Sequence, residues 1–225
     1  MILPRSIDAE FDIPIDRITL KGRFCLPEAA HGIVLFAHGS GSSRKSPRNN
    51  YVAGVLQEKG LGTLLFDLLT ESEDQFYENR FNIGLLTRRL IAVTDWVMIY
   101  SFRHKLPMGY FGASTGAASA LRAAAHFKKQ IAAVVSRGGR PDLAMEDIPR
   151  VTAPSLFLVG GKDIPVIEWN QKAQEAMKAP SKLEIIPGAS HLFEEPGKLQ
   201  QVADLSANWF RTHFQEKEKY VQQSR

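Results

Sequence analysis

The chain has 225 residues, of which 44% are hydrophobic and 23% charged, and its formal net charge at pH 7 is +4. This length and composition predict one soluble globular domain over residues 1–225, with a charged tail at about 216–225. No apolar run has the roughly 18 residues that cross a membrane, and no signal peptide is recognisable. The scattered Lys and Arg residues argue against a nucleic-acid partner. Cys25 is the only cysteine, which excludes an intrachain disulfide and favours the cytoplasm.

Apolar runs of strand length alternate with helix-length segments along most of the chain. Residues 18–26 alternate in polarity around Gly22 and predict a hairpin or two short edge strands. Further strands are expected at residues 32–38, 62–67, 108–112, 131–136, 154–160 and 182–187, and helices at residues 51–60, 82–100, 114–127, 166–179 and 198–214. The alternation predicts an α/β fold with a mostly parallel sheet, helices on both faces and no inserted cap domain.

The stretch Gly112-Ala-Ser-Thr-Gly116 lies between a predicted strand and a predicted helix. A G-x-S-x-G sequence is weak evidence alone, since it also occurs as an ordinary glycine turn. At a sharp strand-to-helix turn, however, it places the serine of a hydrolase in a strained, exposed position. Ser114 is therefore the predicted nucleophile.

A serine hydroxyl needs a base, and in this fold the base follows the nucleophile in the chain. Three histidines follow Ser114: His126, His191 and His213. His126 lies late in the helix after the serine, and His213 lies near the end of the last predicted helix. His191 follows the last predicted strand directly, at the edge where active sites of parallel sheets form, and is the predicted base.

The base needs a carboxylate that orients it, and three aspartates follow predicted strands. Asp163 comes after Gly160-Gly161, which permit a tight turn. Asp142 is the competing residue, whereas Asp67 precedes the serine and fits the chain order badly. Asp163 is the predicted acid, with the role of holding the imidazole tautomer and stabilising the imidazolium.

An oxyanion hole is predicted from backbone N–H groups. One is that of Thr115, directly after the nucleophile, and the other belongs to the loop that begins His38-Gly39. Ser40 is the first choice in that loop and Gly41 the second. His38 is expected to brace the loop rather than act as a base.

These parts resemble a serine hydrolase of the α/β-hydrolase superfamily, and most closely its dienelactone-hydrolase-like branch. The resemblance spans residues 15–215 and is carried by "AHGSGSSR", "LLFDLLTESE", "GYFGASTGAA", "VVSRGGRPDL", "LVGGKD" and "GASHLFEEPG". It implies a small, lidless sheet domain with an ester-hydrolysing site. Typical members of the branch use a cysteine nucleophile, and Ser114 at that position favours a general carboxylesterase. Cys25 is expected to be a small buried apolar residue.

Four residues are candidates for the substrate pocket, each with a structural alternative. Arg137 and Arg140 follow a predicted strand and could bind a substrate carboxylate, or pair with nearby acidic residues. Phe76 and Tyr77 lie in residues 70–81, the longest irregular stretch, and either wall the pocket or pack on the domain. The absence of a cap points to a shallow, open site.

The predicted function is hydrolysis of small carboxylic esters through an acyl-enzyme on Ser114, with no cofactor and no metal. Alternatives on the same residues are a thioesterase, an amidase, an acyltransferase or a dienelactone-type lactone hydrolase. A non-catalytic binding protein of this fold is the least favoured. The expected partner is a small-molecule ester, without nucleic acid or membrane, and the sequence leaves open whether the chain forms a homo-oligomer.

Overall fold

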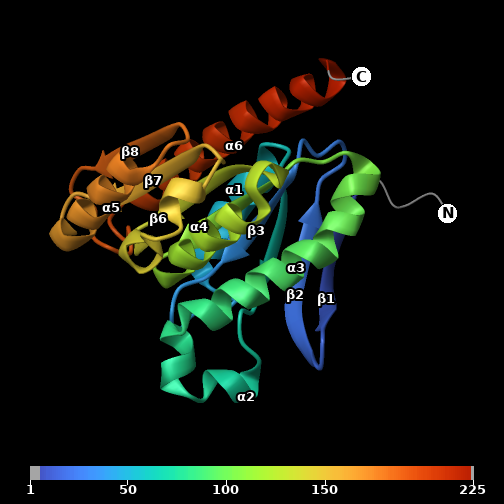
Figure 1. Ribbon diagram of the computed structural model, residues 1–225, viewed down its shortest axis with the longest axis horizontal. Coiled ribbons are helices and arrows are strands. Elements are labelled where there is room, and N and C mark those ends of the chain that lie inside the picture. The colour runs from blue at the N-terminus through green and yellow to red at the C-terminus, as the bar shows by residue number, and fades with distance from the viewer. Residues whose placement is uncertain (1–5, 224–225) are drawn as a thin grey trace.

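The computed structural model describes residues 6–223 and has an eight-stranded sheet at its centre (Figure 1). The strand order is β1-β2-β4-β3-β5-β6-β7-β8. The strands are β1 (Ile7–Ile15), β2 (Ile18–Leu26), β3 (Ile33–Ala37), β4 (Gly62–Phe66), β5 (Met108–Ala113), β6 (Ile131–Arg137), β7 (Ser155–Gly160) and β8 (Ser181–Ile186). β1, β2 and β4 pair antiparallel, and all other neighbours pair parallel. The predicted α/β fold with a mostly parallel sheet is confirmed.

Helices cover both faces of the sheet (Figure 1). They are α1 (Pro47–Glu58), α2 (Glu71–Asp74), α3 (Ile83–His104), α4 (Thr115–Phe127), α5 (Ile164–Ala176) and α6 (Lys198–Gln223). α3 and α4 pack with one apolar cluster, and α1 and α6 with the other. Consecutive residues of β5 reach the two clusters: Tyr110 lies in the first and Phe111 in the second. This alternation shows that the sheet is buried on both faces, as a parallel sheet requires.

The prediction of a hairpin or two short strands within residues 18–26 is wrong. The segment is a single strand, β2, and its hairpin partner is β1, which the sequence analysis did not predict. Gly22 is not a turn residue: a Cβ there would lie 2.8 Å from Ile13 Cδ1 and 3.3 Å from Phe66 Cβ. Glycine is therefore favoured here by close packing rather than by chain reversal. Cys25, in the same strand, is only half-buried, and burial raises the pKa of its thiol.

Residues 70–81, predicted to be irregular, contain two short helical turns. α2 begins with a capping box, in which the Thr70 hydroxyl accepts from the Glu73 N–H and the Glu73 carboxylate accepts from the Thr70 N–H. The 3₁₀ turn Tyr77–Phe81 follows. The last helix also extends past its predicted end at residue 214 to Gln223, so most of the predicted tail is helical, and residues 224–225 lie outside the described part.

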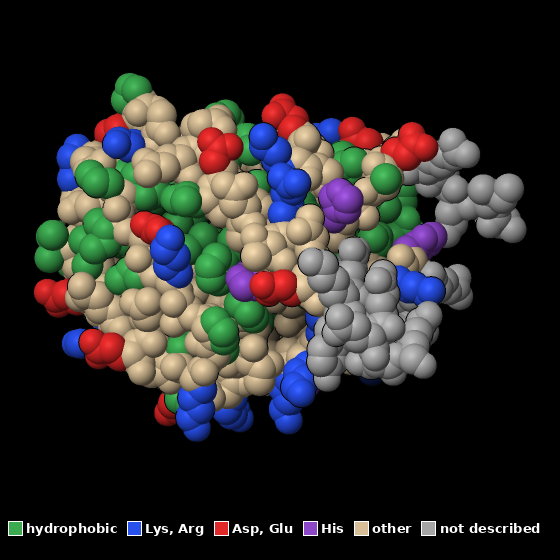
Figure 2. Space-filling model, turned by 90° about the horizontal axis from the view of Figure 1, so that it is seen from above, with side chains coloured by type: hydrophobic (Ala, Val, Ile, Leu, Met, Phe, Trp, Pro, Cys, Tyr) green, Lys and Arg blue, Asp and Glu red, His purple; other side chains and the backbone are tan. Residues whose placement is uncertain are grey.

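Charged side chains of both signs are interspersed on the face of the molecule seen in Figure 2. Among the described residues of that face, Lys and Arg side chains do not join into one continuous basic stripe. Within residues 6–223, none of the helices combines the length and the apolar character that crossing a membrane requires.

Candidate active site

Ser114 stands at a sharp turn between β5 and α4. Its φ of +51° and ψ of −122° are unusual for a residue with a side chain, so the backbone is strained there. Two glycines permit the turn. A Cβ on Gly112 would lie 2.4 Å from Ala117 Cα, and one on Gly116 would lie 2.1 Å from Ala37 O. The G-x-S-x-G stretch thus has the local geometry of a nucleophile elbow.

Asp163 and His191 are in direct contact. His191 Nδ1 lies 2.6 Å from Asp163 Oδ2. The bond favours the tautomer in which Nδ1 carries the proton, and leaves Nε2 free to accept one. The Asp163 side chain is 16% exposed and that of His191 39%, so the acid is covered while the base is reachable.

Backbone contacts hold the turn of Asp163 against the loop of His191. The Gly161 N–H donates to Ile186 O at 2.9 Å, and the Lys162 N–H donates to Ala189 O at 3.0 Å. A Cβ on Gly160 would lie only 2.5 Å from Ala189 O, so glycine allows this close approach. Acid and base are therefore positioned by main-chain structure, independently of any ligand.

Glu195 closes the His191 loop, a role that the sequence analysis missed. Both of its carboxylate oxygens accept from the Ser190 N–H at 3.0 Å, and Lys162 Nζ lies 3.3 Å from Oε1. The hydrogen bond from the Ser190 N–H is the first cause that lowers the pKa of Glu195 to about 2. Its position four residues after a loop histidine was the only signal in the sequence.

Ser114 and His191 share a neighbouring segment. The Ser114 N–H donates to Arg137 O, and the Arg140 N–H donates to Ser114 O, both at 3.1 Å. Between these arginines, a Cβ on Gly138 would lie 3.4 Å from two atoms of the His191 ring. Among the described residues no hydrogen bond joins the Ser114 hydroxyl to His191. Catalytic hydrogen bonds are often long in ligand-free structures and tighten when substrate binds.

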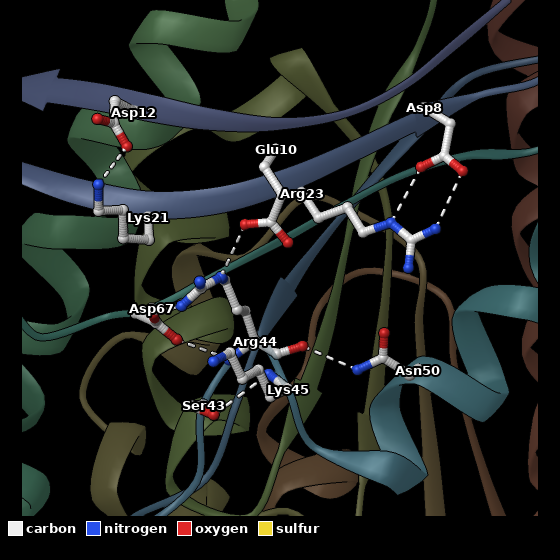
Figure 3. Close-up of polar contacts among 10 residues, drawn as sticks. All are labelled: Asp8, Glu10, Asp12, Lys21, Arg23, Ser43, Arg44, Lys45, Asn50 and Asp67. Atoms are coloured by element: carbon white, nitrogen blue, oxygen red, sulfur yellow. Dashed lines mark hydrogen bonds and ion pairs between the residues drawn. The ribbon is translucent and has the colours of Figure 1, made fainter.

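The competing aspartates have other partners. Asp142 forms a two-pronged ion pair with Arg140, whose guanidinium also lies 4.3 Å from the ring centre of Trp169. Asp67 accepts from the Arg44 N–H at 2.7 Å and from its guanidinium at 2.5 Å. Figure 3 shows Arg44 held between Asp67 and Glu10. Both aspartates therefore support loops rather than a histidine.

The two competing histidines also lie elsewhere. His126 is exposed near the end of α4, about 18 Å of helix rise from Ser114, and its ring contacts that of Phe127. His213, in α6, bonds Glu216 at 2.8 Å and contacts the ring of Trp209. Of the three histidines after Ser114, only His191 meets a carboxylate at the edge where Ser114 lies.

His38 braces the loop after β3, as expected. Its Nε2 accepts from the Leu68 N–H at 3.0 Å, while Nδ1 lies 2.9 Å from Gly39 O. Burial is the main cause that lowers its pKa, which keeps the imidazole neutral. A Cβ on Gly39 would lie 3.2 Å from Ser114 Cβ, so the braced loop is pressed against the candidate nucleophile.

The predicted oxyanion donors lie together but differ in availability. The Ser40 N–H donates to the Thr115 hydroxyl at 2.9 Å. Within the described residues, the N–H groups of Thr115 and Gly41 have no hydrogen-bond acceptor. The Thr115 N–H is one of the unpaired groups at the start of a helix, which suits it to an anion. The first-choice donor, Ser40, is thus already engaged in this structure, and Gly41 keeps a free N–H.

The four pocket candidates have different surroundings. Phe76 and Tyr77 are 63% and 67% exposed, so they do not pack in the core. Arg140 forms the ion pair with Asp142, which was the structural alternative to substrate binding, and Arg137 is buried. The loop after β3 and the segments facing it form a small hollow, lined by His38, Gly39, Ser40, Gly41, Leu69, Asp74, Arg80 and Leu86. Its wall comes from the segment of Phe76 and Tyr77, through Asp74 and Arg80.

Residues 74–216 match the model of the dienelactone hydrolase family. A crystal structure of dienelactone hydrolase from Anabaena variabilis is 51% identical, covers 93% of this chain and 99% of that one, and superposes with a TM-score of 0.89. Two curated Mycobacterium tuberculosis proteins, each named "Putative phosphoribosyl transferase", are 52% identical over 210 residues, which are 93% of this chain. The chain spans about half the length of these relatives, 47%.

More distant structures share the fold alone. Est1E from Butyrivibrio proteoclasticus is 18% identical, covers 91% of this chain and 98% of that one, and has a TM-score of 0.75. The family match, which spans well over half of the chain, and the similarity to the Anabaena variabilis structure agree with each other. The chain belongs to the dienelactone hydrolase family.

Proposed function

We propose that this hydrolase cleaves small carboxylic esters through an acyl-enzyme on Ser114, with His191 as base and Asp163 as the group that orients it. One observation carries the proposal. A strained strand-to-helix turn presents Ser114 at the same sheet edge where a carboxylate holds His191 at 2.6 Å. Strain of this kind persists where the surrounding structure enforces it, and it is common at active sites.

The mechanism follows from the atoms available. His191 Nε2 takes the proton of the Ser114 hydroxyl as Oγ attacks the ester carbonyl. The Thr115 N–H, with an N–H from Ser40 or Gly41, stabilises the oxyanion. The tetrahedral intermediate collapses, His191 gives its proton to the departing alkoxide, and an acyl ester remains on Ser114. Water, deprotonated by His191, then attacks that ester, and the acid and free Ser114 are released.

We do not propose phosphoribosyl transfer, the activity in the name of the Mycobacterium tuberculosis relatives, for this chain. These proteins are about twice as long as the matched part. By contrast, the alignment with the Anabaena variabilis dienelactone hydrolase covers 93% of this chain and 99% of that one. We therefore assign hydrolysis, and not phosphoribosyl transfer, to this chain. Lactone cleavage is the second candidate, because the 51% identical structure is that of a dienelactone hydrolase and a lactone is a cyclic ester.

The test is intact-mass analysis after treatment with a fluorophosphonate, followed by turnover of p-nitrophenyl esters. We expect one adduct on the wild type, none on Ser114→Ala, and loss of turnover in that variant. Ser119→Ala is the matched control, because Ser119 is a buried serine in α4, the helix that follows Ser114, and its hydroxyl has no partner. A folded wild type that takes up no label and turns over no ester would refute the proposal. Matched thioesters and amides then separate the alternative activities.

A further inference from the structure

Arg137, the last residue of β6, is a buried charge without a counter-charge. It is 8% exposed, and its Nη1 is enclosed without a hydrogen-bond partner. Among the described residues its side chain has no hydrogen bond or ion pair. Burial, and then the positive charge of Arg48, lower the pKa of Arg137 to about 10, so the group stays charged at neutral pH. Isolated buried charges are strongly unfavourable, which suggests that something outside the chain compensates this one.

The strand register places this side chain near the candidate active site. Arg137 lies opposite Ala113 in β5 and Leu158 in β7. Leu158 packs in the cluster of the α1 and α6 face, together with Phe193. Residues level with each other in neighbouring strands point to the same face, so Arg137 points there as well. Phe193 follows His191 by two residues, and the guanidinium therefore lies on the side of the sheet that the His191 loop covers.

A second guanidinium faces the same region. Arg48, in the first turn of α1, bonds Glu194 Oε1 through Nη1 at 3.0 Å, while its Nε is enclosed without a partner. Arg48 is close enough for its charge to act on Arg137. Glu194 thus pairs with Arg48, and within the described residues the charge of Arg137 has no ion-pair partner.

We propose that Arg137 and Arg48 form a binding site for an oxyanion, either a phosphate or a carboxylate group, beside the His191 loop. Guanidinium groups present forked N–H donors that match the oxygens of such groups. A bound oxyanion would supply both the missing charge and acceptors for the unpaired N–H groups. The anion is either a group on the substrate or a free ion, and the two sources share this chemistry.

The experiment measures binding of inorganic phosphate by calorimetry and by thermal unfolding. For the wild type we expect saturable binding and a rise in Tm with phosphate. Arg137→Met should abolish both effects, and Arg48→Met should weaken binding at least about tenfold, as the loss of a charge-assisted contact predicts. Arg150→Met is the control, because the Arg150 side chain is an ion-paired arginine that is 68% exposed. It should bind phosphate like the wild type.

A second readout separates this site from a structural role. Without phosphate, Arg137→Met should unfold at the same temperature as the wild type or higher, because it removes an uncompensated buried charge. Should that variant fail to fold, Arg137→Lys keeps the charge, loses the fork and should bind phosphate more weakly. No saturable binding to the wild type up to about 10 mM phosphate would overturn the proposal. Retention of binding in the Arg137 variant, or clear destabilisation by Met, would also overturn it.

Enzyme kinetics then identify the source of the anion. If phosphate competitively inhibits the turnover of esters with an acidic acyl group, but not that of neutral esters, the site binds a group on the substrate. Binding that leaves the KM of both esters unchanged would assign it to a free ion. Phosphate binding is measured without turnover. The binding result therefore tests the anion site even if the chain proves not to hydrolyse esters.

Discussion

Gly116 packs closely against the backbone at the end of β3, which makes Gly116→Ala a direct test of the elbow. An added Cβ would lie 2.1 Å from Ala37 O and 2.4 Å from His38 O. Side-chain Cβ atoms keep at least 3.0 Å from such atoms, so the first oxygen would have to retreat by about 0.9 Å (3.0 − 2.1). Both oxygens belong to the backbone at the end of β3, which cannot rotate away. We expect a loss of about 3 kcal/mol of stability, the upper end for an overpacked interior.

Activity should suffer as well as stability. The displacement separates the start of α4, which carries the Thr115 N–H, from the loop that carries Ser40 and Gly41. A misplacement near 1 Å can reduce an enzymatic rate about 100-fold, since oxyanion stabilisation depends on exact donor positions. We therefore expect kcat for p-nitrophenyl esters to fall by about that factor at a temperature where the variant remains folded.

Urea unfolding and ester turnover measure the two effects, with Gly54→Ala as the matched control. Gly54 lies inside α1, and a Cβ there would meet nothing within 4 Å. Because alanine favours helix over glycine, this control should gain about 1 kcal/mol and keep its activity. If Gly116→Ala is as stable and active as the wild type, the close approach of α4 and β3 is not what positions the site.

Three further predictions address the loops around Ser114. Asp163→Asn should lower kcat by about 10⁴ with little change in KM, whereas Asp142→Asn should keep most of the activity. If Asp142→Asn instead causes the larger loss of kcat, Asp142 is the residue that orients the base. Thr115→Val should lower kcat about 10- to 100-fold and Thr115→Ser should not, because only serine keeps the hydroxyl that accepts from the Ser40 N–H. If the valine variant keeps its full kcat, the second oxyanion donor is the Gly41 N–H. Glu195 has its pKa lowered from 4.5 to about 2, so its carboxylate stabilises the fold above pH 4.5 and this contribution disappears as pH falls toward 2. The urea midpoints of wild type and Glu195→Gln should therefore differ most above pH 4.5 and converge in acid, and a pH-independent difference would contradict this.

Most of the sheet could be predicted from the sequence because its strands are continuous apolar runs. The predicted strand at 131–136 and the helix at 114–127 differ from β6 and α4 by one residue at one end each. β1 was missed because its alternation is weak: it is an edge strand whose first residues are mostly exposed, so burial imposes little pattern on it. α2 was missed because it is a single turn that depends on its cap rather than on periodicity.

The site could be predicted only where position in the chain implies position in space. Asp163 and His191 follow neighbouring parallel strands, β7 and β8, so their meeting follows from topology. The bond from the Ser40 N–H to the Thr115 hydroxyl joins residues 75 positions apart and depends on local geometry that no pattern encodes. The pairing of Arg140 with Asp142 is local, and was foreseen only as an alternative to substrate binding.

Two unfavourable features of the molecule lie side by side at one edge of the sheet. Ser114 directly follows the end of β5 in a strained backbone conformation, and Arg137 ends β6 as a buried charge without a partner. The Ser114 N–H bonds Arg137 O, so one hydrogen bond connects the two. Neither feature helps the chain to fold, and proteins retain such costs mainly where a ligand or a reaction requires them. Their adjacency gives a physical reason to look for the proposed ligand of Arg137 and the proposed substrate of Ser114 in the same place.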